Sequence, residues 1–305
     1  MISIVKTRKI WYGAAAVYLL VAIAAIVGYG FKPGIDFTGG TLLEVDFAEQ
    51  RPATAEVYDA LKSLDLGTIV AQPADEQAML IRLPFLNAEQ HQDVLTRLDT
   101  LNGPAAVVET RYETIGPSIS SELKSKSISA IVLVIVGIML YITWTFRKVS
   151  KPVPSWAYGS IVVVALVHDV IVPAGVMAVL GHFVGYEIDT LFVVALLTIL
   201  AFSVNDTIVT FDRIRENLVR APQPDFADTV DNSIAETITR SIATSFAVLL
   251  TMFAVYFFGG ETVKHFMLIM IVGMIAGTYS SIFLASPLLV DLARRMDVHN
   301  IVTKK

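Results

Sequence analysis

An acidic residue lies inside a long apolar stretch of this 305-residue sequence. The stretch, Leu191–Phe211, is long enough for a membrane-spanning helix, which needs about 20 mostly apolar residues. Asp206 lies within it, and a carboxylate in a spanning helix costs about 2.5–3.5 kcal/mol on insertion scales. The default interpretation is a functional site at this ionisable group.

The polar neighbours of Asp206 support this interpretation. Ser203, Thr207 and Thr210 lie three or four residues from Asp206 or from one another. On a helix such spacings place side chains on one face. We therefore expect this face to point toward protein or a wet cavity rather than toward lipid.

Two other apolar runs carry ionisable residues. His168 and Asp169 lie near the middle of one, either as a functional pair or as a buried hydrogen-bonded pair that locks helix packing. Arg240 lies immediately before another run, Ser241–Phe258, in a polar stripe with Thr237, Ser241, Thr244 and Thr251. It is either a snorkelling arginine at a membrane boundary or a partner of Asp206. The matching polar face around Asp206 favours the partnership.

No enzyme chemistry is apparent in the sequence. Cysteine is absent, which excludes disulfides and thiolate metal sites. There is no nucleotide-binding loop or metal-ligand cluster, and His168-Asp169 has no nucleophile nearby in sequence, so an intramembrane hydrolase is unsupported. We expect no catalytic residue, no metal and no cofactor.

The composition is that of an integral membrane protein. Hydrophobic residues make up 54% and charged residues 17%, whereas soluble domains carry about 25% charge. Ile10–Tyr29 predicts an uncleaved first span rather than a signal peptide, because it is full-length and lacks a clear cleavage site. Five further runs predict spans: Ile128–Phe146, Trp156–Leu180, Leu191–Phe211, Ser241–Phe258 and Phe266–Leu292.

Residues 31–126 interrupt this pattern with an acidic, soluble segment. Short strands are predicted at Thr41–Phe47, Thr68–Ala71, Ala78–Leu83 and Ala105–Ile115. Two helices are predicted between them, one capped by Thr54 and the other by Asn87. The β-α-β-β-α-β order predicts a small ferredoxin-like α+β domain.

The basic residues predict the orientation. Almost all those in the short connections fall on the side of the N-terminus, which the positive-inside rule assigns to the cytoplasm. We expect six spans, both termini cytoplasmic and the soluble domain extracytoplasmic. The predicted parts are the N-terminus with span 1 (1–30), the soluble domain (31–126), spans 2–6 (127–292) and a cytoplasmic tail (293–305).

Several motifs together resemble the SecF branch of the bacterial SecD/SecF family, within the resistance-nodulation-division superfamily. The first is Gly34–Thr41, which contains Asp36, Gly39 and Gly40. The others are Gly116-Pro117, His168-Asp169, Asn205–Asn217 and Phe258-Gly259-Gly260. The resemblance covers nearly the whole chain, and the much larger extracytoplasmic region of SecD is absent.

The resemblance implies a translocase subunit in the bacterial cytoplasmic (inner) membrane that acts with SecD to draw preproteins outward, using the proton-motive force. Asp206 and Arg240 match the family's proton-relay pair, with protons as the coupling ion. Asn205, Ser203, Thr207, Thr210, His168 and Asp169 would be supporting polar residues. Gly34, Asp36, Gly39 and Gly40 would form a structural motif at the base of the external domain. Six spans would be half of a twelve-span core.

The implied partners are SecD in a heterodimer, the SecYEG translocon, YajC, YidC, the unfolded preprotein and membrane lipid, with no nucleic acid. One alternative is a passive scaffold that stabilises SecD and the translocon without conducting protons. Another, a small-molecule exporter, is disfavoured by the small external domain.

Overall fold

The computed structural model describes residues 3–48, 50–101, 107–147, 152–220 and 223–302, without side chains at 261–262 and 297–302. The chain forms two compact units. One contains Met1–Lys32 with Ser129–Lys305, and the other is Pro33–Ile128. The boundaries of the second unit differ by two residues at each end from the predicted soluble segment, 31–126.

The first unit is helical, and the described residues contain six helices that are long and apolar enough to cross a membrane, as predicted. The sixth spans Val263–Met296 and is assembled from three consecutive elements. The elements are α1 (Arg8–Tyr29), α5 (Pro117–Thr145, of which residues 129–145 belong to this unit), α6 (Ser155–Phe183), α7 (Thr190–Arg220), α8 (Phe226–Phe258), α9 (Glu261–Tyr279), the π-helix η1 (Ser280–Ala285) and α10 (Ser286–Val302).

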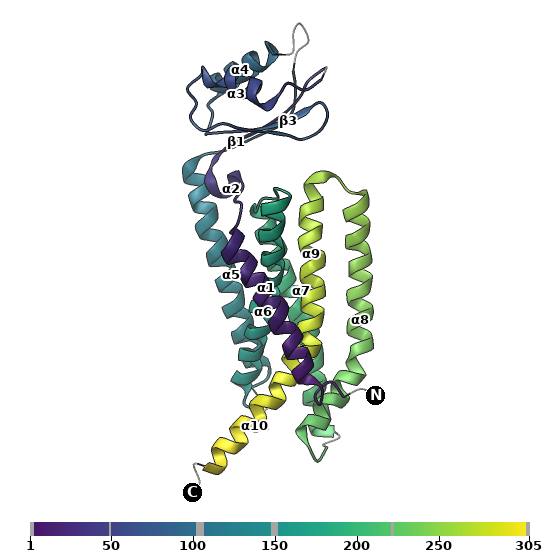
Figure 1. Cartoon of the computed structure of the whole chain (residues 1–305). Helices are drawn as coiled ribbons and strands as arrows, with labels where there is room; N and C mark the ends of the chain where they lie inside the picture. Colours follow the sequence, from purple (N-terminus) through teal and green to yellow (C-terminus); the bar gives the residue numbers. More distant parts are fainter. Residues whose placement is uncertain (1–2, 49, 102–106, 148–151, 221–222, 303–305) are drawn as a thin grey trace. The chain divides into compact units, whose positions relative to one another are not determined.

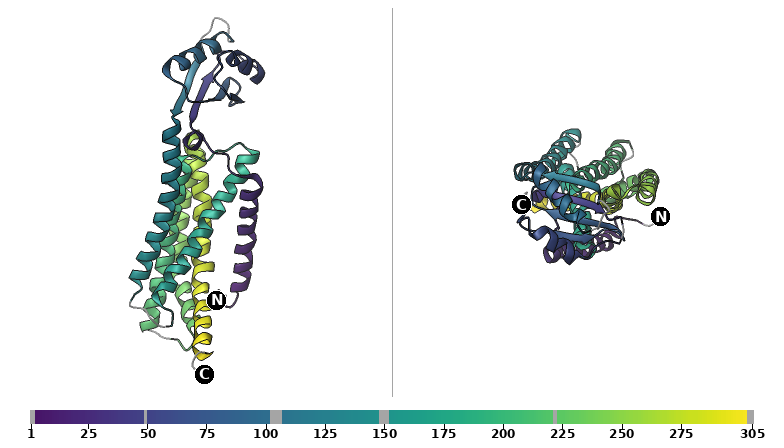
Figure 2. Two further views of the ribbon diagram at one scale, coloured as in Figure 1. Left: turned by 90° about the vertical axis from the view of Figure 1, so that its left-hand side faces the viewer. Right: turned by 90° about the horizontal axis from the view of Figure 1, so that it is seen from above.

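Burial is distributed unevenly over these helices. α6, α7 and the sixth span are largely buried and form the centre of the helical unit, whereas α5 and α8 are largely exposed. α1 packs on α6 and lies at the edge of the helical unit (Figure 2). α8 and α9 run side by side and are joined by a short turn (Figure 1). The polar residues of α7 therefore lie in the part of the unit that is best shielded from lipid.

The second unit is a small antiparallel sheet with two helices on one face (Figure 1). Along the chain it contains a one-turn helix α2 (Ile35–Thr38), β1 (Gly40–Asp46), α3 (Thr54–Lys62), β2 (Val70–Pro73), β3 (Ala78–Leu83), α4 (Ala88–Asp99) and β4 (Val108–Ile115). The strand order is β2-β3-β1-β4, with every neighbouring pair antiparallel. Alternate residues of β1 and β3 meet the apolar stripes of α3 and α4, so Val57 and Leu98 are fully buried.

Several local predictions for this unit need correction. The predicted cap Thr54 is wrong, because Ala53 takes the cap position and its N–H is bound by the Glu56 carboxylate at 3.1 Å. The second strand begins at Val70 rather than at Thr68. The last strand was predicted to begin at Ala105, which lies outside the described residues, and β4 is seen from Val108. The Asn87 cap is confirmed, since its side chain accepts from Gln90 N at 2.9 Å.

The α9 face with Gly273 and Gly277 packs within the chain against α7. A Cβ atom on Gly273 would lie 2.1 Å from Ile199 Cδ1, and one on Gly277 would lie 3.0 Å from Ser203 Cβ. Small residues at helix interfaces permit this close backbone approach. The approach places the end of α9 directly against Ser203 of α7.

Gly273→Ala should therefore lower the free energy of unfolding in detergent by about 1–3 kcal/mol, because Ile199 is buried and cannot move aside freely. Ile199→Ala in the same chain removes the clash, so the double variant should be less destabilised than the sum of the two single changes. Gly137→Ala, at a position with open space, is the control. Strict additivity of the two changes would contradict the predicted contact.

Candidate functional site

The polar face of α7 is buried in the helical unit. Ser203, Asp206, Thr207 and Thr210 are all at most 8% exposed, as their shared spacing predicted. Thr207 Oγ1 donates to Ser203 O, and Thr210 Oγ1 donates to Asp206 O. The Asp206 carboxylate and the Ser203 hydroxyl are thus left to bond with other helices. Asn205 is different, because it lies on the exposed side of α7.

Asp206 is linked to two neighbouring helices through hydroxyl groups. Ser245 Oγ, on α8, donates to Asp206 Oδ2 at 3.2 Å. Thr278 Oγ1, at the end of α9, donates in turn to Ser245 Oγ at 2.9 Å. This chain of hydroxyls leads to a carboxylate that lies buried inside the helical unit. Carboxylates inside spanning helices mark ion pathways and proton relays in pumps and transporters.

The structure does not bring Arg240 to Asp206. Among the ion pairs of the described residues, none joins these two side chains, and Arg240 is exposed. It lines a cleft of about 340 Å³ together with Val209, Asp212, Arg213, Glu216, Glu236 and Thr237. A direct Asp206–Arg240 pair is therefore a prediction that this structure does not bear out.

Helix geometry explains the difference. The predicted polar stripe of α8 divides into two faces. Ser233, Thr237, Ser241 and Ser245 are buried at four-residue steps, while Arg240, Thr244 and Thr251 are exposed. On a helix with 3.6 residues per turn, the residue three positions further along lies about 60° back around the helix axis. This rotation takes Arg240, three residues after Thr237, off the narrow buried face. Ser245 was not recognised from the sequence, although it continues the four-residue series and could have been found from it.

A second buried network surrounds Asp169. His168 Nδ1 lies 2.7 Å from Asp169 Oδ1, and His168 Nε2 lies 2.8 Å from the hydroxyl of Tyr18 on α1. Ser280 Oγ donates to Asp169 Oδ2 at 2.8 Å, and Ser203 Oγ donates to the same oxygen. The fully buried Asp169 carboxylate therefore has partners on two other helical elements, α7 and η1, besides its own histidine neighbour.

The two networks meet at α7. Ser203 bonds to Asp169, and it lies one helical turn before Asp206 on the same buried face. Tyr18 and Ser280 were not recognised from the sequence. Tyr18 lies in an uninterrupted apolar run. Ser280 begins a π-helix, whose register cannot be predicted from a local sequence pattern. π-Helical turns occur frequently at functional sites.

The motif Gly34–Gly40 belongs to the other compact unit and forms its first turn. Gly34 precedes α2, Asp36 lies in its first turn, and Gly39 N closes it by donating to Ile35 O at 2.8 Å. Gly39 and Gly40 have φ values of +73° and +121°, which L side chains rarely adopt. A Cβ on Gly40 would lie 2.7 Å from Leu83 O. The glycine pair thus turns the chain from α2 into β1 beside β3.

Comparison with known proteins covers both units. Residues 96–295 match the family described as protein export membrane protein SecD/SecF, C-terminal, and residues 24–50 match the SecD/SecF GG motif. The protein translocase subunit SecF of Thermobaculum terrenum is 38% identical, over 95% of this chain and 94% of its own length. The SecF subunit of Anaerolinea thermophila is 33% identical over the same shares of the two chains.

Solved structures agree with these sequence relatives. The crystal structure of SecDF, a translocon-associated membrane protein from Thermus thermophilus, superposes with a TM-score of 0.78 at 30% identity over 95% of this chain. A SecDF structure in a super-membrane-facing form gives a TM-score of 0.70 at 29% identity over 99% of this chain. This chain covers 38% of the first SecDF chain and 40% of the second.

Proposed function

The chain belongs to the SecD/SecF family, and from this premise we propose that it acts with SecD to draw preproteins across the bacterial cytoplasmic membrane, using the proton-motive force. The observation that carries the proposal is the buried Asp206 carboxylate with its Ser245–Thr278 hydroxyl chain. A proton is the ion that such a group would bind. No catalytic residue, metal or cofactor enters the proposal.

A SecD partner is supported by the SecDF structures and by exposed polar groups. This chain matches well under half of each SecDF chain, so the spans of SecD would supply the other half of the membrane core. Asn205, Arg240 and Thr244 are exposed on α7 and α8, although polar side chains in membranes usually face a bundle interior. The spans of SecD would cover them. In the same proposal SecYEG, YajC and YidC are further partners.

The orientation follows the basic residues, with both termini cytoplasmic and residues 31–126 extracytoplasmic. The strand order β2-β3-β1-β4, with antiparallel neighbours, supports a ferredoxin-like fold for this external domain. Its role would be to hold the unfolded preprotein on the outer side. Arg240 would approach Asp206 only in another conformation, so that conformation and protonation would influence each other reciprocally.

Export measured in membrane vesicles tests the proposal. Vesicles with this chain and SecD should export a preprotein faster when a proton gradient is present, and a protonophore should remove the difference. Vesicles that contain SecD but lack this chain should show no stimulation by the gradient. A passive scaffold, the second candidate function, would instead raise export equally with and without the gradient, and that result would reject proton coupling.

A further inference from the structure

A basic cavity lies at the end of the helical unit where α1 begins and α10 follows the sixth span. Its volume is about 550 Å³, and its lining shares no residue with the networks of Asp206 or Asp169. The lining residues are Arg8, Lys9, Tyr12, Asp291, Arg294 and Arg295. Four cationic side chains thus face a single carboxylate.

That carboxylate is already engaged. Asp291 accepts from Arg8 Nε at 2.8 Å and from the Tyr12 hydroxyl at 3.0 Å. Arg294 lies 3.6 Å from Asp225, outside the cavity lining. Lys9 and Arg295 are exposed and form no ion pair or side-chain hydrogen bond within the part of the chain that the structure describes. The cavity therefore carries an excess of positive charge that an anion would neutralise.

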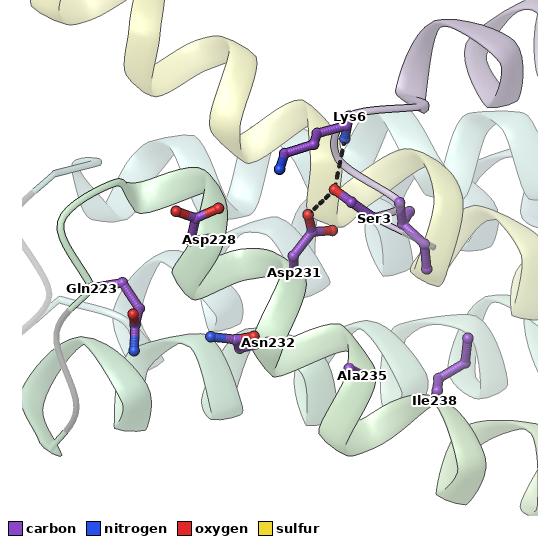
Figure 3. Close-up of a pocket in the computed structure, with 9 residues that line it drawn as sticks. Ser3, Lys6, Gln223, Asp228, Asp231, Asn232, Ala235 and Ile238 are labelled. Carbon is purple, nitrogen blue, oxygen red and sulfur yellow. Dashed lines mark hydrogen bonds between the residues drawn. The ribbon is translucent and has the colours of Figure 1, made fainter. Parts of the chain in front are cut away.

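The N-terminal segment that supplies half of this charge is held in place. Ser3 Oγ donates to the Asp231 carboxylate (Figure 3). Val5 N donates to Asp231 Oδ1 at 2.9 Å. Arg8 Nη1 donates back to Val5 O at 2.8 Å. The cleft beside Asp231, of about 460 Å³, contains Asp228 and Lys6 and has no cationic excess. Of these two clefts, the basic cavity alone suits an anion.

The position of the basic cavity along α1 indicates the source of the anion. Ile10, immediately after Lys9, is 68% exposed and begins the apolar surface of α1. Tyr12 has the amphipathic ring that is enriched at membrane interfaces. The cavity thus opens where apolar helix surface gives way to charge, the level of lipid headgroups.

We propose that this cavity binds the phosphodiester headgroup of an anionic phospholipid. Lys9 and Arg295 would pair with the phosphate, since charge-assisted hydrogen bonds from arginine and lysine to phosphate are strong. The acyl chains would lie along the exposed apolar face of α1. Free phosphate shares the anionic chemistry but would gain nothing from that apolar face. The inference does not depend on the proposed export function.

Native mass spectrometry of the full chain in neutral detergent tests this by titration with phosphatidylglycerol, phosphatidylcholine or inorganic phosphate. We expect one tightly held phosphatidylglycerol. Lys9→Gln/Arg295→Gln should weaken its binding about 25-fold, because each basic residue near an anionic membrane surface contributes about fivefold. The charge-preserving Lys9→Arg/Arg295→Lys variant should bind like the wild type.

Arg215→Gln/Arg220→Gln is the matched control, because it removes the same charge from α7, where both arginines are paired with acidic residues. Binding in this control should be unchanged. The proposal is overturned if phosphatidylcholine binds as tightly, if the control loses binding equally, or if inorganic phosphate displaces the lipid at equal concentration.

Discussion

Vesicles that carry Asp206→Asn should export preprotein at the rate seen without a proton gradient, whatever gradient is applied. Asparagine keeps the shape of the side chain and an oxygen that can accept from Ser245, but it cannot titrate. Assembly with SecD and the amount of protein in the membrane should therefore be unchanged. Export rates measured over a range of gradients, at equal protein level, give the comparison.

Asp212→Asn provides the control for this experiment. Asp212 is on the same helix, but its side chain is 54% exposed and pairs with Arg215 three residues away. An exposed pair of this kind contributes little to stability. Gradient-dependent export should survive in the control. A fully active Asp206→Asn protein would remove this residue from the mechanism and favour the passive scaffold.

The largest effect on stability is expected for Asp169→Ala. The change leaves His168, Ser203 and Ser280 without the carboxylate that they share in a fully buried site. Breaking a buried charged network by removing one partner costs about 3–5 kcal/mol. Unfolding of the purified chain in detergent, followed by temperature or denaturant, measures the loss.

Asp169→Asn separates a packing role from a role in proton transfer. It keeps the volume and one acceptor oxygen, so the loss should be about 1–3 kcal/mol. If His168-Asp169 locks helix packing, gradient-dependent export per molecule should persist while stability falls. Normal stability with loss of the gradient response would instead place Asp169 in the proton path through Ser203.

Hydropathy and helical spacing are properties of short segments, and they were enough to predict much of the fold of this protein. The six spans, the soluble segment and the buried face of α7 could be read from residues a few positions apart. The alternating strand pattern and the Asn87 cap were local in the same way. A spanning helix must satisfy its backbone hydrogen bonds internally, so its position follows from its own residues.

The partners of the buried polar groups were decided only by the tertiary structure. Ser245 rather than Arg240 meets Asp206, because the four-residue series of α8 faces α7 and Arg240 lies outside it. Tyr18 reaches His168 through the packing of α1 on α6, and Ser280 reaches Asp169 through the π-helix. Each contact depends on the rotation and spacing of two helices far apart in sequence. Those quantities are set by close packing across the whole bundle, which no local pattern contains.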